Sequence, residues 1–356
     1  MFELQKIISG ERKDAVAKLA RLLLYVQAVA VYKPLISLRN RLYDKQWLKS
    51  YRLGVPVICV GNITAGGTGK TPMVVWLCRY LLQHGKKVAM LSRGYKGSDK
   101  TGNDEIQMLR QTLPEVPVVI NPDRVRGGRE AIEKYHPDII VMDDGFQHRR
   151  LRRDLDIVMI DCTCPFGYEA LLPRGLLREP LEQLRRADAI VLSRADLISD
   201  DELNAIKNRL NAGETGKIIA CCRHQPKALF RSDDEEIPLS QLSGRKVAAF
   251  CGIGNPESFP ATLNQLGAKV IARKFLPDHV SYNETIVSQL SQWRRDSGAD
   301  WLMTTEKDWV KLKQFPAVRK WRELHWLEIE LDVTEGREQL GRKINEIIGY
   351  RPKIGG

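Results

Sequence analysis

The stretch VPVICVGNITAGGTGKTP at residues 55–72 decides the fold. Its first part, Val55–Val60, is apolar and β-branched, which is typical of a central parallel strand. A glycine-rich segment ending in Gly69-Lys70-Thr71 follows, and the residues from Pro72 onward have the length and apolar spacing of a helix. A strand, a glycine loop and a helix in this order predict a phosphate-binding loop for a nucleoside triphosphate.

The residues of this loop have distinct expected tasks. Backbone N–H groups of the glycine segment surround phosphate oxygens, Lys70 reaches the β- and γ-phosphates, and the Thr71 hydroxyl is placed for a magnesium ion. Thr64 stands where the usual pattern has glycine, so the loop departs from the generic form, and a plain strand-to-helix turn is the alternative. We expect the nucleotide to be bound by Thr64, Ala65, Gly66, Gly67, Thr68, Gly69, Lys70 and Thr71.

The composition indicates a globular protein with negatively charged binding partners. Of 356 residues, 43% are hydrophobic and 28% charged, which excludes disordered, collagen-like and polytopic membrane classes. The net charge of +12 suits nucleic acid, anionic lipid or phosphorylated substrates. Because the chain lacks clustered aromatics for stacking on single strands, we expect no nucleic-acid partner. Seven cysteines without metal-type spacing predict reduced thiols in a reducing compartment.

The N-terminal segment suggests a membrane surface. Residues 1–53 carry eleven Lys or Arg against four Asp or Glu, around an apolar run at Leu22–Tyr32 that is interrupted by Gln27. Eleven residues fall short of the roughly 20 that a membrane span requires. We therefore expect a basic amphipathic helix lying on an anionic leaflet. The alternative is a first helix that packs on the domain.

Alternating strands and helices predict an α/β protein with a parallel sheet. We expect a phosphate-loop NTPase domain over residues 1–222, an exposed linker at 223–243, and a smaller Rossmann-like α/β domain at 244–356. The linker expectation rests on the charged run Arg231–Glu236 and on scattered prolines. Predicted strands after the loop are 87–91, 116–121, 139–142, 155–160, 189–192, 246–251, 269–272 and 301–304; predicted helices are 104–112, 126–135 and 283–297.

A carboxylate pair follows one of the predicted strands. Ile139–Met142 is apolar and runs directly into Asp143-Asp144. This arrangement holds magnesium, directly or through water, in nucleotide-binding sheets. The next segment, Gly145–Arg153, is dense in donors and is expected either to clamp anions or to form a solvated basic face.

A second segment supports a rival interpretation. Val191–Leu197 reads VLSRADL and is similar in pattern to the guanine-reading segment of GTPases, in which Asn-Lys-x-Asp follows a strand. Here Ser193 and Arg194 replace Asn and Lys, so only Asp196 remains to read a base. A P-loop GTPase or metal-chaperone NTPase is therefore the alternative function.

Several blocks together carry a family resemblance. They are GGTGKTP at 66–72, SRGY at 92–95, DDGFQHRRLRRDLDIV at 143–158, LPRGLLREPL at 172–181, SRADL at 193–197 and TEKDWVKL at 305–312. In this order they resemble the tetraacyldisaccharide 4′-kinases of lipid A biosynthesis, over nearly the whole chain. The resemblance implies two α/β domains and transfer of the ATP γ-phosphate, with Mg²⁺, to the 4′-hydroxyl of an acylated glucosamine disaccharide 1-phosphate, giving lipid IVA. It also implies a peripheral protein at the cytoplasmic face of a Gram-negative inner membrane.

The resemblance also implies site residues. The family's catalytic carboxylate matches Asp104, which would act as base with His279 as its partner, while Lys70 and Arg178 stabilise the phosphates. Metal-site residues would be Thr71, Glu105, Asp143, Asp144 and Glu179, with an ordinary helix-surface salt bridge as the alternative role of Glu179. Because Asp104 and His279 fall on opposite sides of the predicted linker, we expect the two domains to close during catalysis.

Overall fold

The computed structural model describes residues 8, 12, 14–94, 104–211, 216–278 and 280–349, with the side chains of Asp104 and Glu105 left aside. The chain divides into two compact units. Unit 1 comprises Met1–Lys100, Leu113–Arg223 and Leu331–Gly356; unit 2 comprises Thr101–Thr112 and His224–Glu330.

Unit 1 is built on a parallel sheet in the order β7-β6-β5-β1-β4-β2-β3. Every residue of β1, β2 and β4 is buried, as expected for parallel strands covered on both faces. The strands are β1 (Val57–Asn62), β2 (Val88–Ser92), β3 (Val118–Ile120), β4 (Ile139–Asp143), β5 (Leu155–Asp161), β6 (Ala189–Ser193) and β7 (Ile218–Arg231).

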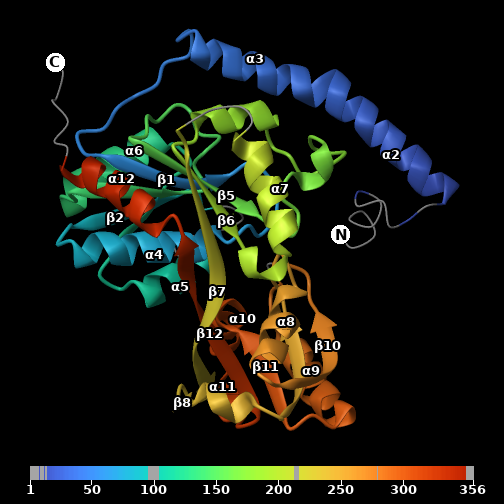
Figure 1. Ribbon diagram of the computed structural model, residues 1–356. Helices are drawn as coiled ribbons and strands as arrows, with labels where there is room; N and C mark the ends of the chain where they lie inside the picture. The colour runs from blue at the N-terminus through green and yellow to red at the C-terminus, as the bar shows by residue number, and fades with distance from the viewer. Residues whose placement is uncertain are drawn as a thin grey trace. The chain divides into compact units, whose positions relative to one another are not determined.

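The helices of unit 1 pack on this sheet (Figure 1). One buried cluster joins strand residues to Val125 and Ala131 of α6, and another joins them to Leu203 and Ile206 of α7. The helices are α4 (Lys70–Gln83), α6 (Arg124–Tyr135), α7 (Asp200–Asn211) and α12 (Arg337–Gly349), with short 3-10 turns η2 (Gly167–Glu169), η3 (Leu181–Arg186) and η4 (Ala195–Leu197).

The N-terminal segment of unit 1 forms one continuous helix, drawn in blue in Figure 1. It consists of α2 (Ala15–Gln27), the π-helical turn η1 (Ala28–Tyr32) and α3 (Lys33–Asp44). By length and composition alone, this helix of 30 residues is long and apolar enough to cross a membrane. The length expected from the sequence was too short because it counted only the apolar run Leu22–Tyr32, whereas the helix extends beyond this run in both directions.

Unit 2 is a smaller α/β structure with the parallel strand order β10-β9-β11-β12. Its strands are β9 (Lys246–Cys251), β10 (Lys269–Phe275), β11 (Trp301–Thr305) and β12 (Leu324–Glu335). Its helices are α5 (Asp104–Thr112), α8 (Ser258–Gln265), α9 (Glu284–Ser297), α10 (Glu306–Leu312) and α11 (Pro316–Arg319). A phosphate-loop sheet with a second Rossmann-like α/β part is the fold class that the sequence predicts, and that prediction is confirmed.

The predicted linker at 223–243 is wrong in its local structure. Strand β7 runs through to Arg231, β8 (Glu236–Ile237) pairs with it antiparallel, and η5 (Leu239–Leu242) follows. The middle of β7 is polar because its side chains alternate between exposed and partly buried positions, and cross-strand pairs such as Lys227–Glu328 support it. The chain after Leu331 belongs to unit 1, not to a separate C-terminal part.

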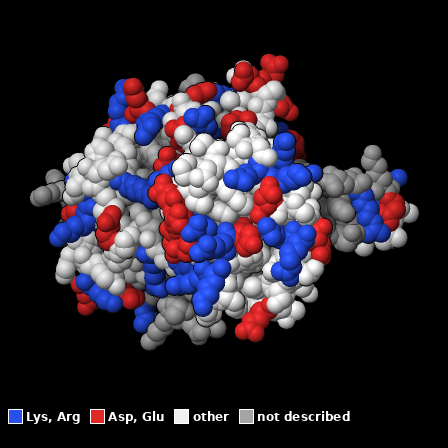
Figure 2. All heavy atoms as spheres, turned by 90° about the horizontal axis from the view of Figure 1, so that it is seen from below, with Lys and Arg blue, Asp and Glu red and all other residues white. Residues whose placement is uncertain are grey.

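The surface charge is mixed. On the face seen in Figure 2, Lys and Arg lie interspersed with Asp and Glu over most of the visible area. This face therefore does not present the single-sign field that would concentrate the net charge of +12.

Candidate active site

The predicted phosphate loop lies between β1 and α4. Gly66 and Gly69 have φ angles of 116° and 84°, in the left-handed region where glycine is favoured, and Gly69 is the residue that precedes α4. Helix α4 begins at Lys70, so Lys70 and Thr71 occupy its first turn, where N–H groups have no partner within the helix. This is the geometry of an anion site at a helix N-terminus.

Three polar side chains donate hydrogen bonds to residues of the phosphate loop. Asn62 donates to the Thr68 hydroxyl (3.0 Å), Ser193 Oγ donates to the Thr68 carbonyl (2.9 Å), and Arg194 donates to the Gly67 carbonyl (3.0 Å). Arg194 also pairs with Asp161 at the end of β5. Ser193 and Arg194 are thus engaged with the phosphate loop, and the SRADL block braces this loop through them.

The departure at Thr64 has a structural reason. Thr64 forms a β-bridge with Leu177, and the neighbouring Ala65 N–H donates to the Leu176 carbonyl at 2.7 Å. A Cβ placed on Gly167 would lie 3.1 Å from the Thr64 methyl group, so glycine at 167 makes room for it. Thr64 therefore docks the 172–181 block against the phosphate loop.

The carboxylate pair at the end of β4 lies beside the loop. In the register of β1 and β4, Val60 pairs with Asp143, so both strands end at the same edge of the sheet. Asp144, which has a left-handed φ of 49°, accepts hydrogen bonds from Arg178 at 3.0 and 3.1 Å and lies 3.5 Å from Lys70 Nζ. The predicted residues Lys70, Asp144 and Arg178 are therefore in direct contact.

The pKa of Asp144 reflects these partners. Burial by itself raises the pKa of this carboxyl, but the charges of Lys70 and Arg178 outweigh burial, and the net result is a pKa below the usual value. Asp144 is therefore ionised at neutral pH. Asp143 is buried, with 8% of its surface exposed.

Arg124, at the start of α6, is a site residue that the sequence did not reveal. It is 2% exposed, and its guanidinium donates to the Asn121 and Asp143 carbonyls. Burial lowers its pKa, while the charges of Asp143 and Asp144 raise it. An arginine in an ordinary helical first turn carries no distinguishing sequence pattern, so nothing in the chain pointed to it.

Glu179 is not brought to the phosphate loop by any contact in the described structure. It is fully buried and pairs with Arg186, and its other oxygen accepts from Asn40 of α3 at 3.2 Å. These partners give Glu179 a structural task, the docking of α3, through a buried ion pair rather than the helix-surface salt bridge of the alternative. Tyr32 adds to this docking, because its hydroxyl donates to the Arg178 carbonyl at 2.9 Å.

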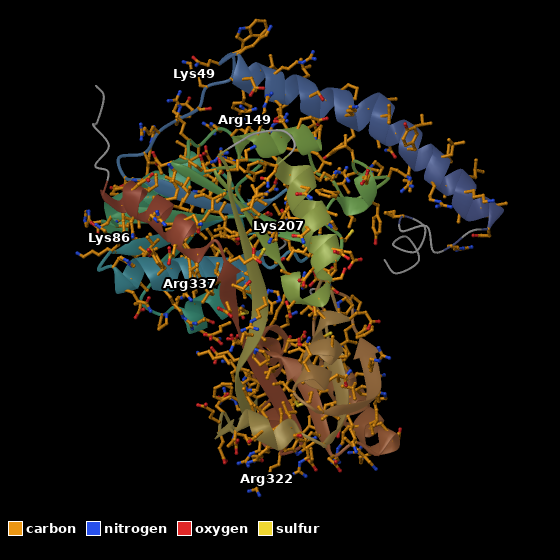
Figure 3. The ribbon with its side chains drawn as sticks, in the orientation of Figure 1. Lys49, Lys86, Arg149, Lys207, Arg322 and Arg337 are labelled. Carbon is orange, nitrogen blue, oxygen red and sulfur yellow. The ribbon has the colours of Figure 1, made fainter. Side chains whose placement is uncertain are left out.

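The basic loop after the carboxylate pair is mostly engaged with protein groups. Arg149 donates to the Asn40 carbonyl and to Asp44 of α3 (Figure 3), and Arg153 pairs with Asp156. Burial and neighbouring arginines lower the pKa of His148 to about 4, so it is neutral at physiological pH. Of the two alternatives for this loop, the solvated basic face does not hold for Arg149 and Arg153, because their guanidinium groups bond to protein groups.

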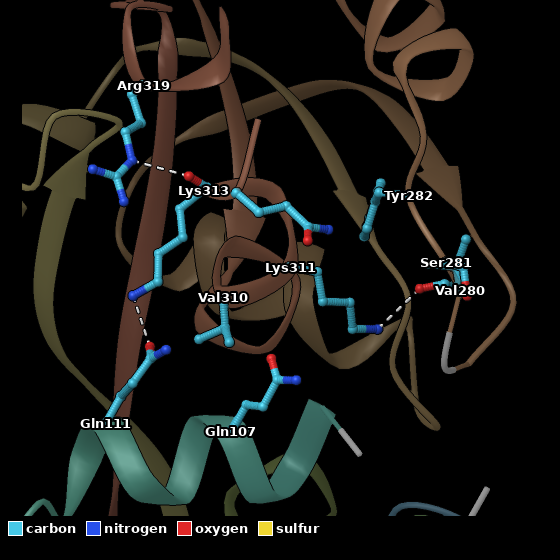
Figure 4. A pocket seen from close by; sticks show the side chains of 10 residues that line it. Gln107, Gln111, Val280, Ser281, Tyr282, Val310, Lys311, Lys313 and Arg319 are labelled. Carbon is cyan, nitrogen blue, oxygen red and sulfur yellow. Dashed lines mark hydrogen bonds between the residues drawn. The ribbon is translucent and has the colours of Figure 1, made fainter. Parts of the chain in front are cut away.

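The remaining predicted residues can be placed only in part. Asp104 and Glu105 begin α5, and His279 lies outside the described residues. Helix α5 and the neighbours of position 279, among them Val280 in Figure 4, both belong to unit 2. The expected domain closure was based on Asp104 and His279 lying in different domains, and this division of the chain does not support that basis. Among the residues that the structure describes, no cluster of three or more His, Cys, Asp or Glu side chains could hold a metal ion.

Comparisons with known proteins identify the family of this chain. The family described as tetraacyldisaccharide-1-P 4′-kinase matches residues 19–348. The tetraacyldisaccharide 4′-kinase of Syntrophus aciditrophicus is 39% identical over 306 residues (79% of this chain, 82% of the relative), and that of Anaeromyxobacter sp. strain K is 36% identical over 343 residues (92% and 90%). The crystal structure of LpxK from Aquifex aeolicus in complex with ATP is similar with a TM-score of 0.71 and 34% identity, covering 92% of this chain and 99% of that one. The chain belongs to the tetraacyldisaccharide-1-P 4′-kinase family.

Proposed function

We propose that this protein transfers the γ-phosphate of ATP, with Mg²⁺, to the 4′-hydroxyl of an acylated glucosamine disaccharide 1-phosphate, giving lipid IVA. The observation that carries the proposal is the contact of Lys70, Asp144 and Arg178 at the phosphate loop, in a chain of this kinase family. The GTPase or metal-chaperone alternative is not favoured, because Ser193 and Arg194 bond to the loop backbone.

In the proposed reaction the 4′-oxygen forms a bond to the γ-phosphorus as the bond to the β,γ-bridging oxygen breaks, and ADP leaves. Asp104 accepts the proton of the hydroxyl, which is a poor nucleophile until deprotonated, and His279 orients that carboxylate. Lys70 and Arg178 neutralise charge on the phosphate oxygens, which is the main task of a protein in phosphoryl transfer.

The donor set beside the loop suits magnesium. The carboxylates of Asp143 and Asp144 and the hydroxyl of Thr71 are hard oxygen ligands, and magnesium takes one or two carboxylates and completes its shell with phosphate oxygens and water. When bound, the ion spreads the charge that develops on the transferred group. Glu179 is left out of this set because its contacts in the described structure are with Arg186 and Asn40 and not with the phosphate loop.

We also propose that the N-terminal helix rests peripherally on the anionic cytoplasmic face of the inner membrane. Its apolar side chains, among them Leu19, Leu23 and Val26, are 53 to 62% exposed, at spacings that share one helix face. The part from Tyr32 onward bonds to residues of unit 1 through Asn40 and Asp44. The docking of this part on the rest of unit 1 supports a peripheral position.

Two experiments test these proposals. If the donor is ATP, unlabelled ATP displaces a labelled ATP analogue far better than GTP does; preferential displacement by GTP contradicts the kinase proposal. For the membrane, a variant with Leu19→Glu and Leu23→Glu should float poorly with phosphatidylglycerol vesicles, whereas Ile271→Glu, at an exposed apolar position of β10, should float like the unmodified protein. Equal flotation of all three proteins contradicts the peripheral helix.

A further inference from the structure

Tyr32 is the residue at which the N-terminal helix begins to bond to the rest of unit 1. It is the last residue of the π-helical turn η1, and its hydroxyl donates to the Arg178 carbonyl at 2.9 Å. Among the described residues of α2 and η1, no other side chain makes a hydrogen bond outside this helix. The first bond between the helix and the rest of unit 1 therefore goes to a residue of the candidate active site.

The π-helical turn changes the helix face that docks. Lys33 N–H donates to the Ala28 carbonyl, five residues back, whereas an α-helix has four. Ala28 is buried, and in an uninterrupted α-helix Leu35, seven residues further on, would share its face. Leu35 is instead 61% exposed. The extra residue rotates the following turns, so that Tyr32 and Asn40, and not Leu35, bond to the rest of unit 1.

The backbone of Arg178 is held on both sides. Its N–H donates to the carbonyl of Ile63, just after β1, at 2.7 Å, and its own carbonyl accepts from Tyr32. The side chain between these two bonds donates to Asp144 at 3.0 and 3.1 Å, and Asp144 lies 3.5 Å from Lys70 Nζ. Tyr32 thus fixes the backbone of a residue whose guanidinium lies at the phosphate loop.

The Tyr32 hydroxyl is a hydrogen-bond donor at neutral pH. Burial raises its pKa, and the negative charge of Glu179 raises it further, against smaller opposing effects of Arg178 and Arg39. The net shift is upward from an ordinary value of about 10. The bond to the Arg178 carbonyl is therefore insensitive to pH near neutrality.

A second chain of hydrogen bonds leads from the same helix face to the phosphate loop. Arg39 Nη2 donates to the Gln147 carbonyl at 2.6 Å. The Gln147 amide donates to the Asn62 carbonyl at 2.8 Å, and the Asn62 amide donates to the Thr68 hydroxyl at 3.0 Å. Residues 32 and 39 are seven apart and share a face of a helix. This face therefore bonds both to Arg178 and, through two intermediate residues, to the loop itself.

We propose that Tyr32 is a positioning residue for phosphoryl transfer: its hydroxyl fixes the Arg178 backbone and thereby sets where the Arg178 guanidinium reaches. The proposal rests on the proposed function, in which Arg178 neutralises charge on the phosphate oxygens. Loss of the hydroxyl leaves the Arg178 carbonyl without this donor and frees the backbone on one side. Small displacements of a group at the reacting phosphate lower the rate, by up to about 100-fold for about 1 Å.

The test is a mutant cycle on the full-length protein, with ATP and the acylated disaccharide 1-phosphate as substrates. Tyr32→Phe, which removes only the hydroxyl, is made alone and with Arg178→Met. Tyr135→Phe, the same change at a 37% exposed tyrosine of α6, is the matched control and should leave kcat unchanged. We expect Tyr32→Phe to lower kcat about three- to tenfold, with KM for the lipid acceptor within about twofold. In the Arg178→Met background the same change should alter kcat less than about 1.5-fold, because the guanidinium that Tyr32 positions is gone.

Other roles of Tyr32 give different patterns. If Tyr32 serves only the contact of the helix with lipid, Tyr32→Phe raises KM for the acceptor and leaves kcat unchanged. If it serves only the fold, Tyr32→Phe lowers the melting temperature, and any loss of kcat is the same with and without Arg178. Either result overturns the positioning proposal while the proposed function stands. If Arg178→Met alone retains full kcat, the role of Arg178 in the proposed function fails, and this proposal fails with it.

Discussion

The guanidinium of Arg194 donates a hydrogen bond to the Gly67 carbonyl, 3.0 Å away, while it pairs with the Asp161 carboxylate. Arg194 itself adopts a left-handed φ of 56°, which directs its side chain from the end of β6 to the phosphate loop. The loop backbone is therefore held in place before any nucleotide arrives, and this preorganisation reduces the ordering cost of binding.

Arg194→Lys should weaken ATP binding about tenfold, which corresponds to about 1.4 kcal/mol. Nη1 of Arg194 makes both bonds, and the shorter side chain of lysine does not carry its nitrogen to that position while keeping both partners. Calorimetric titration with ATP measures the change, and Arg152→Lys, at an exposed arginine, serves as control. An unchanged dissociation constant for Arg194→Lys would show that the brace does not shape the loop.

Glu179→Gln should reduce the free energy of unfolding by about 3 kcal/mol, because it leaves the largely desolvated, partly buried Arg186 without its counter-charge. The magnesium concentration for half-maximal activity should stay the same. Urea unfolding and a magnesium titration check both results, with the exposed Glu182→Gln expected to change stability by less than about 0.5 kcal/mol. If the Glu179→Gln variant needs more magnesium but keeps its stability, Glu179 contributes to the metal site and the structural assignment is contradicted.

Thr64→Gly restores the generic loop pattern and should nevertheless destabilise the protein by about 1 kcal/mol. The glycine adds backbone freedom to the unfolded chain and removes the methyl group that packs beside Gly167. Thermal unfolding with and without ATP is the measurement, and Thr64→Ser, which keeps the hydroxyl, should lose less. A more stable glycine variant would remove the docking role of Thr64.

Some elements of the fold could be predicted from the sequence, and others could not. The strands from β1 to β6 were predictable because most of their residues are apolar, and the loop and Asp143-Asp144 were predictable because they adjoin such strands. Strand β7 escaped because Pro226 and the surrounding polar residues resemble a linker, although its pairing supports a strand. The tasks of Arg124, Arg194 and Glu179 depend on contacts between distant segments, which no local pattern records.

His325 should make the protein lose stability as the pH falls. Burial lowers its pKa from the ordinary value of about 6.5 to about 4, so the unfolded chain takes up a proton before the folded chain does. The stability that is fully present above about pH 6.5 is therefore lost progressively towards pH 4, by an amount of the order of 3 kcal/mol. His325→Phe, which keeps a ring to stack on Trp301, should flatten that part of the stability profile. An equally steep profile in the Phe variant would contradict this assignment.

The central claim, γ-phosphate transfer to the lipid disaccharide, is tested most directly by incubating the protein with γ-labelled ATP, magnesium and the acylated disaccharide 1-phosphate and following the label into lipid. We predict rapid transfer to the 4′ position by the unmodified protein and a loss of at least about 100-fold with Lys70→Ala and with Asp104→Asn. No label in the lipid, or undiminished transfer by Asp104→Asn, would contradict the account.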